Sequence, residues 1–163
     1  IISDAYENGV PMGSDLILKE DQSPSFFIWA AKDPSKTSLQ RIQIIKGWVE
    51  DGEGKEAVID VACSDGLSVD PDTNRCPDNG ATVDLTNCEI TPNKGAKELS
   101  IVWKDNNFSQ DQRAFYYVRV LENPTCRWST YDAIRAGVQP RPGMKATIQD
   151  RAWSSPIWYQ PNT

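Results

Sequence analysis

The chain contains no histidine, and this absence removes several kinds of chemistry at once. Among its 163 residues there is no imidazole, the side chain whose ordinary pKa lies nearest neutrality. Catalysis by Ser-His-Asp or Cys-His groups is therefore excluded within this chain. The commonest protein ligand of transition metals is missing as well.

Long hydrophobic runs, phosphate loops and an excess of basic residues are also missing. The longest uninterrupted apolar run is Phe26–Ala31, far too short to span a bilayer. Gly52-Glu53-Gly54 is typical of a turn and is not a phosphate-binding loop. Because the net charge is −6 and the pI is near 4.7, we expect neither nucleic acid nor an anionic membrane surface as a partner.

The sequence also lacks a signal peptide and does not start with methionine. It begins at Ile1, so we expect either a processed protein or a fragment of a longer one. Ala5–Asn8 is typical of a last helical turn, with Gly9 as its left-handed stop. A domain rarely begins with the end of a helix, so this pattern favours a fragment.

Four cysteines are present, namely Cys63, Cys76, Cys88 and Cys126. Their spacing fits no zinc pattern, so two disulfides and an oxidising compartment are expected. The alternative is four reduced thiols in a cytosolic protein. Three connectivities are possible, and the polar loop between Cys63 and Cys76 favours that pair, which leaves Cys88 for Cys126.

The strongest strand pattern is Ala114–Leu121. Its odd-numbered residues would face one way and its even-numbered residues the other, and both sets are mostly apolar. We therefore expect a central strand that is covered on two sides. Further strands are expected at Leu16–Leu18, Ser25–Ala31, Leu39–Glu50, Glu56–Cys63, Thr82–Ile90, Leu99–Lys104 and Thr147–Tyr159, with a hairpin turn at Asp51-Gly52.

Helical patterns are few and short. Ser129 and Asp132 are spaced as in a capping box, and they predict a helix to Ala136 that stops at Gly137. Phe108–Gln112 is typical of a single helical turn. About seven short strands with one short helix predict an antiparallel β-sandwich.

Oxygen-bearing side chains form no convincing catalytic or metal site. Asp70, Asp72 and Asn74 alternate like the start of a calcium loop, with Asp78 further on, but Arg75 and Ala81 replace the glycine and glutamate that such a loop requires. A solvated loop explains this pattern more simply. Two acids inside strand patterns, Asp60 and Asp84, are the candidates for a carboxylate pair of the glycosidase type. Nothing in the sequence brings them together, so no catalytic, cofactor or metal residue is assigned.

Six tryptophans are many for this length: Trp29, Trp48, Trp103, Trp128, Trp153 and Trp158. Exposed tryptophans on a β-sandwich could stack against sugars. Most of them alternate with apolar neighbours, which favours packing in the core or between domains. Trp48 and Trp158 break a clean inward pattern, so they are the best candidates for exposure.

Five segments resemble signatures of the bacterial family called domain of unknown function 3604, in matching order and spacing over nearly the whole chain. They are Gly9–Leu16, Arg41–Trp48, Ala114–Glu122, Arg127–Ala133 and Arg151–Tyr159. The resemblance implies a parent protein several times longer and typically exported. Its N-terminal barrel would be similar to metal-dependent hydrolases of the polymerase-and-histidinol-phosphatase type. The metal ligands would lie in that barrel, so no catalytic residue is carried onto this chain.

The combined expectation is an immunoglobulin-like C-terminal domain that completes such a barrel in a periplasmic or extracellular protein. Residues 1–20 would form the connector from the missing N-terminal domain, and residues 21–163 the β-sandwich. Trp128, Tyr131 and Trp153 would belong to the contact with the barrel. The alternatives are a carbohydrate- or protein-binding module, a hydrolase based on carboxylates alone, and a calcium-stabilised structural domain.

Overall fold

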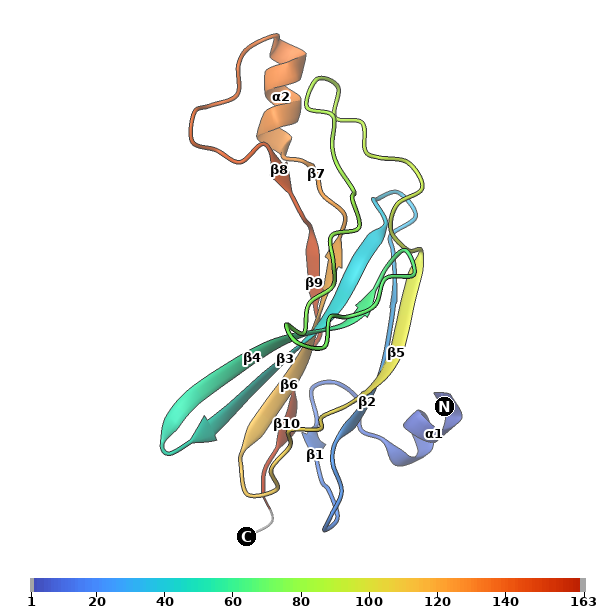
Figure 1. The fold of residues 1–163 in the computed structure, drawn as a ribbon, viewed down its shortest axis with the longest axis vertical. Helices are drawn as coiled ribbons and strands as arrows, with labels where there is room; N and C mark the ends of the chain where they lie inside the picture. Colours follow the sequence, from blue (N-terminus) through green and yellow to red (C-terminus); the bar gives the residue numbers. More distant parts are fainter. Residues whose placement is uncertain (1, 162–163) are drawn as a thin grey trace.

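The computed structural model describes residues 2–161, which are mostly β with two helices (Figure 1). The helices are α1 (Ile2–Asn8) and α2 (Trp128–Ala136). The strands are β1 (Asp15–Leu16), β2 (Ser25–Ala31), β3 (Leu39–Glu50), β4 (Glu53–Cys63), β5 (Glu98–Lys104), β6 (Ala114–Glu122), β7 (Thr125–Cys126), β8 (Thr147–Ile148), β9 (Arg151–Trp153) and β10 (Ile157–Tyr159). None of the described helices is long and apolar enough to cross a membrane.

The larger sheet is arranged around β6, as the sequence pattern predicts. Its order is β1-β10-β6-β3-β4, and β9 also pairs with β6. β6 is antiparallel to β3, β9 and β10, whereas β1 is parallel to β10. The expectation of a purely antiparallel sheet is therefore wrong at this one edge, where β1 returns beside the last strand.

A second sheet, β2 paired with β5, covers one face of the larger sheet, and β7 pairs with β8 in a third. Phe26 and Ile28 of β2 pack with Ile42 and Ile44 of β3, and Tyr116 of β6 belongs to the same buried cluster. Even-numbered residues of β3 and β6 thus face the core. Odd-numbered residues of β6 face the opposite side, where Phe115 and Tyr117 are only half-buried. The expected cover on both sides of β6 is therefore incomplete.

Both disulfides are present in the favoured pairing. One joins Cys63 at the end of β4 to Cys76, and the other joins Cys88 to Cys126 of β7. The first holds the long segment between β4 and β5 against the end of β4, and the second attaches it to the end of the molecule that carries β7, β8 and α2 (Figure 1). Two disulfides indicate an oxidising location outside the cytoplasm.

Several local expectations need correction. The predicted strand over Thr82–Ile90 is reduced to one bridge between Val83 and Ile90, because the segment turns at Asp84–Cys88. Phe108–Gln112 forms a turn, and the predicted helical turn is absent there. Within residues 2–161 the structure has two helices instead of one, and ten strands instead of about seven.

The helix ends are also partly different from expectation. Gly137 closes α2 in the left-handed conformation, as predicted. The prediction of a capping box is wrong, because Ser129 lies inside α2. The N-cap residue is Arg127, whose side chain makes no capping hydrogen bond. Gly9 follows α1 but is not left-handed. A Cβ there would lie 2.5 Å from the carbonyl oxygen of Ala5, so close contact explains this glycine.

A buried ion pair joins the two sheets at one end of the core. The Lys46 ammonium lies 2.6 Å from the Asp105 carboxylate, and the two side chains are only 7% and 3% exposed. Tyr116 donates its hydroxyl to Asp105 at 2.7 Å, and Lys46 also donates to the Asn107 carbonyl. These contacts connect β3 and β6 to the end of β5. Burial and the hydrogen bond to Asp105 both raise the pKa of Tyr116 far above its ordinary value.

We expect Lys46→Met to destabilise the domain by about 3–5 kcal/mol, because the substitution leaves the Asp105 charge buried without its partner. The double variant Lys46→Met/Asp105→Asn removes that charge while keeping an acceptor for Tyr116. It should therefore be more stable than Lys46→Met alone. Guanidinium unfolding of both single variants and the double variant measures the coupling. Strictly additive losses would contradict the role given to this pair.

Candidate functional site

Asp60 is buried and serves as a structural acceptor. Its carboxylate accepts hydrogen bonds from the Gln43 amide at 2.6 Å and from the backbone N–H of Cys76 at 2.8 Å. The guanidinium groups of Arg41 and Arg75 lie 3.5 and 3.7 Å away. This carboxylate therefore faces cations and amides rather than a second acid.

The loop with alternating oxygen side chains satisfies its own backbone. Asp70 accepts hydrogen bonds from the backbone N–H groups of Asp72 and Thr73, and these bonds lower the pKa of Asp70. The backbone N–H and C=O of Asp70 pair with Arg75 and Asn74. The hydrogen bond from the Asp72 backbone N–H to the Asp70 carboxylate makes this segment an Asx turn. Within residues 2–161, no group of three or more Asp, Glu, Cys or His side chains is placed to hold a metal ion.

The remaining acidic candidates lie in turns of their own. Asp84 is exposed and accepts hydrogen bonds from the hydroxyl and backbone N–H of Thr86, which lower its pKa. Asp78 accepts the backbone N–H of Gly80. Asp60 and Asp84 thus lie in separate hydrogen-bonded settings, and the structure does not join them as an acid pair.

Four of the six tryptophans are exposed. The exposed fractions are 61% for Trp29, 72% for Trp128, 58% for Trp153 and 45% for Trp158. The expectation for Trp158 is confirmed. The expectation for Trp48 is wrong, because its side chain packs against the core and lies under the Lys46 ammonium, 5.4 Å from the ring centroid. Tyr131, predicted to lie in an interface with Trp128, is also exposed.

Two of the exposed tryptophans lie on the same face of the larger sheet. Trp153 is directly opposite Arg119, and Trp158 is directly opposite Phe115, so their side chains share the odd-numbered face of β6. With Tyr117 they form what we call the outer aromatic face, composed of Phe115, Tyr117, Trp153 and Trp158.

Ring contacts order this face. The rings of Phe115 and Tyr117 are inclined by only 8°, with centroids 6.3 Å apart, and Phe115 also contacts Trp158 at 5.4 Å. Phe115 lies over Gly47 of β3, where a Cβ would come within 2.3 Å of the ring. The glycine is therefore needed for the aromatic ring to lie flat on the sheet.

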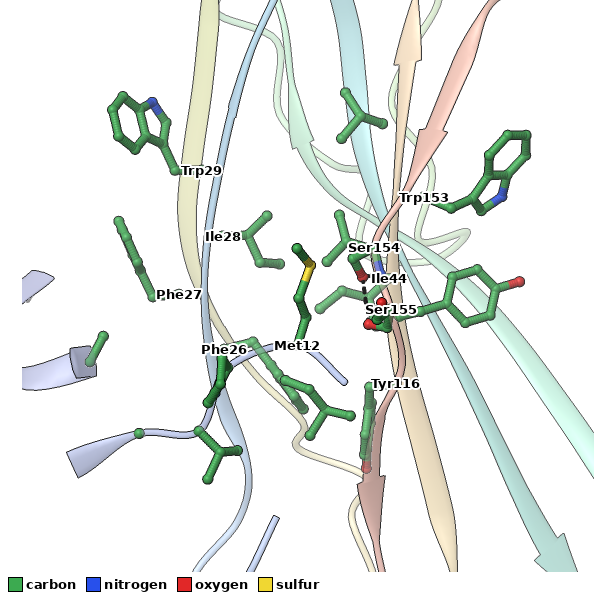
Figure 2. Close-up of a pocket in the computed structure, with 18 of the residues that line it drawn as sticks. Met12, Phe26, Phe27, Ile28, Trp29, Ile44, Tyr116, Trp153, Ser154 and Ser155 are labelled. Carbon is green, nitrogen blue, oxygen red and sulfur yellow. Dashed lines mark hydrogen bonds between the residues drawn. The ribbon is translucent and has the colours of Figure 1, made fainter. Parts of the chain in front are cut away.

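An apolar cleft of about 580 Å³ opens between β2 and the strands β6, β9 and β10. Figure 2 shows Met12, Phe26, Ile28 and Ile44 directed into it, whereas Trp29 points away on the far side of β2. Trp153 points away on the opposite side of the cleft. Because most of its lining is apolar, this cleft is suited to apolar contact.

A second pocket of about 720 Å³, here called the polar pocket, lies beside β9. Its lining comes from segments that are far apart in the sequence: Gln40, Asp78, Ala81, Pro124, Arg127, Lys145, Thr147, Ile148, Gln149, Asp150, Arg151 and Trp153. Sequence reasoning missed it, since no local motif links these positions. The one available signal was their concentration in the two polar loops on either side of β6.

Near this pocket, burial and the charge of Asp150 raise the pKa of Glu122 above its ordinary value. The folded state therefore binds this proton more tightly than the unfolded state, and stability falls as pH rises above about 4.3. Glu122→Gln should raise the melting temperature at pH 7, and the gain should vanish below pH 4.

Asp84→Asn is the control of opposite sign. Thr86 lowers the pKa of Asp84, so this substitution should lower stability at pH 7 and have no effect well below pH 4. Thermal unfolding followed by circular dichroism across this pH range measures both variants. A Glu122→Gln gain that persists unchanged at pH 3 would contradict the assignment.

Comparison with known proteins gives one finding. The family described as "Protein of unknown function (DUF3604)" matches residues 1–161. No curated protein and no solved structure matches the chain. Since the match spans nearly every residue, from α1 to the end of β10, the chain belongs to the DUF3604 family of proteins of unknown function.

Proposed function

We propose that this chain is the non-catalytic C-terminal accessory domain of a larger exported protein, and that it docks on a metal-dependent hydrolase barrel in the same polypeptide. Its two packed sheets would be an immunoglobulin-like β-sandwich, with residues 1–20 as the connector. The resemblance of the five sequence segments supports this placement. The absence of histidine agrees with metal ligands that lie elsewhere.

The exposure of four tryptophans is the observation that carries the proposal. Covering a large apolar side chain stabilises an assembly by about 1.5–3 kcal/mol. Trp128 and Tyr131 lie on α2, and Trp29 lies on the outer side of β2 next to Phe27, which is also exposed. These side chains leave apolar surface exposed, and a docking partner would cover it.

Export is supported by the two disulfides, which suit the periplasm or the extracellular space. The clusters around Asp60 and Asp70 use their carboxylates in local hydrogen bonds, so a hydrolase based on these acids has no free pair to act with. Neither cluster therefore competes with the accessory role.

The proposal predicts hydrolysis only in the longer protein. A panel of generic phosphoesters and esters would be assayed with Zn²⁺, Mn²⁺ or Mg²⁺, using this chain alone and the full-length parent. Chelator-sensitive turnover by the parent and none by this chain is the expected result. Metal-dependent turnover by this chain alone would refute an accessory role.

The outer aromatic face favours a second function, binding of carbohydrate. Trp153 and Trp158 are exposed on one sheet face, and the ring of Phe115 lies between Trp158 and Tyr117. Phe115 and Tyr117 are nearly parallel, and the Trp158 ring is inclined by 51° to Phe115. Exposed aromatic rings gathered on one sheet face are suited to contact with the apolar faces of sugar rings. The same face would equally contact an extended protein segment.

This second function predicts that Trp158→Ala weakens binding to an insoluble neutral polysaccharide such as cellulose by about tenfold, which corresponds to about 1.4 kcal/mol. Trp128→Ala is the matched control, because Trp128 lies on α2 and outside the outer aromatic face. Pull-down isotherms measure both variants. Equal losses for the two variants, or no retention of the unmodified chain, would exclude this face as a sugar site.

A further inference from the structure

The polar pocket has the size and composition of a ligand site. Its volume of about 720 Å³ falls within the range of about 300–1,000 Å³ that is usual for small-molecule sites. It lies where β9 meets the loop at 78–81, the segment 145–150 that contains β8, and the start of α2. Unlike the apolar cleft, it combines cationic, amide and carboxylate groups with one aromatic ring.

The cations that line the pocket form no ion pair among the described residues. Within residues 2–161, no carboxylate lies within ion-pair distance of Arg127, Lys145 or Arg151. Two acids, Asp78 and Asp150, also line the pocket, so the lining carries a net positive charge although the whole chain carries −6.

Arg41 adds to the positive charge from behind the lining. It donates to the side-chain oxygen of Gln40, which lines the pocket. Burial first, and then repulsion from Arg119, Arg151 and Arg75, lower the pKa of Arg41, while Asp60 opposes the shift. One carboxylate thus faces several guanidinium groups, and an incoming anion would relieve the imbalance.

Two buried guanidinium nitrogens in this region make no hydrogen bond. They are Nε of Arg127, and Nε of Arg41, which faces the Asp60 carboxylate at 3.5 Å. A buried donor without an acceptor costs about 1–3 kcal/mol, so such atoms are uncommon in a finished core. Arg127 lines the pocket directly, and its planar fork matches the paired oxygens of a carboxylate or a sulfate group.

The amide side chains of the pocket are held in fixed positions. Gln149 donates to Gln40 at 2.8 Å and to the Glu122 carbonyl at 3.1 Å, while Gln40 donates to Asn79 at 3.1 Å. Asn79 in turn donates to Asn123, so the network reaches the end of β6. A rigid wall of this kind reduces the entropy lost when a ligand binds.

Trp153 distinguishes a sugar from a simple anion. Its ring is exposed and belongs both to the polar pocket and to the outer aromatic face. Asp78 and Asp150 line the pocket and supply acceptors for hydroxyl groups, which a simple anion such as phosphate at neutral pH would use less than a sugar. The mixture of acceptors, cations and one ring suits a polyhydroxylated ligand that carries acidic groups.

We propose that the polar pocket binds an acidic saccharide, with its carboxylate or sulfate group between Arg127 and Arg151 and a sugar ring against Trp153. This proposal rests on the second function above and names its ligand class. Lys145 contributes positive charge to the lining. The Gln149 amide already donates hydrogen bonds to Gln40 and to the Glu122 carbonyl, so it would bind the ligand only by giving up one of them. The chain would then hold an anionic polysaccharide close to the larger protein of which we propose it is a part.

The test compares polygalacturonate, dextran sulfate and unmodified dextran, using isothermal titration calorimetry on the whole chain at low and physiological salt. We expect the chain to bind at least one acidic polymer at least tenfold more tightly than dextran. Preference for polygalacturonate identifies a uronic acid ligand, and preference for dextran sulfate identifies a sulfated one. No binding to either acidic polymer would overturn the proposal.

Variants locate the site. Arg151→Gln and Arg127→Gln should each raise the Kd for the preferred acidic polymer at least tenfold. Arg135→Gln, which removes the same charge from the last turn of α2, should leave it unchanged. Equal losses for Arg135→Gln and Arg151→Gln would mean unspecific charge attraction and would contradict the pocket. Arg151 is exposed, so this variant remains informative if Arg127→Gln fails to fold.

Trp153→Ala and Trp158→Ala separate this proposal from the broader one. Binding in the polar pocket predicts a loss of acidic-polymer affinity with Trp153→Ala and little change with Trp158→Ala. Weakened binding to both acidic and neutral polymers with Trp158→Ala would place the ligand on the outer aromatic face alone. Loss of cellulose binding with retained acidic-polymer binding would refute the broader function and keep the pocket.

Discussion

The contact between the β2–β5 sheet and the larger sheet is the interaction on which the rest of the structure depends. Phe26 and Ile28 meet Ile42 and Ile44 there, and the Lys46–Asp105 pair fixes one end of the contact. Two strands cannot cover a sheet of six, so part of the inner face opens into the apolar cleft. The outer aromatic face lies on the opposite side of the larger sheet, which β2 and β5 do not cover.

The long segment between β4 and β5 has little regular structure, and its position depends on cross-links instead. Two disulfides attach it to β4 and β7, and Asn79 is buried among Gln40, Asn123 and the Ser64 hydroxyl. These contacts bring residues 78–81 against the loop that precedes β9, and the polar pocket lies between them. The disulfides thus position a wall of that pocket as well as stabilising the fold.

Sequence patterns predicted much of the fold because they are local. The alternation in β6, the hairpin turn between β3 and β4, and the stop of α2 at Gly137 each depend on neighbouring residues. Thr82–Ile90 failed as a strand because its residues bond within their own turns, where Thr86 and Asp84 pair. Trp48 was misjudged because its cover, the Lys46 ammonium, is a charge that binary patterning assigns to solvent. The polar pocket was out of reach for sequence reasoning, since its residues meet only through tertiary structure.

The claim that the exposed aromatic surfaces are covered by another domain is tested most directly by hydrogen–deuterium exchange with mass spectrometry. Exchange would be compared between this chain alone and the same residues in the full-length parent. The account predicts slower exchange in the parent for peptides from β2 and α2, which carry Trp29 and Trp128, and unchanged exchange for the β3–β4 turn at Asp51. Identical exchange of the β2 and α2 peptides in both proteins would contradict the docking role.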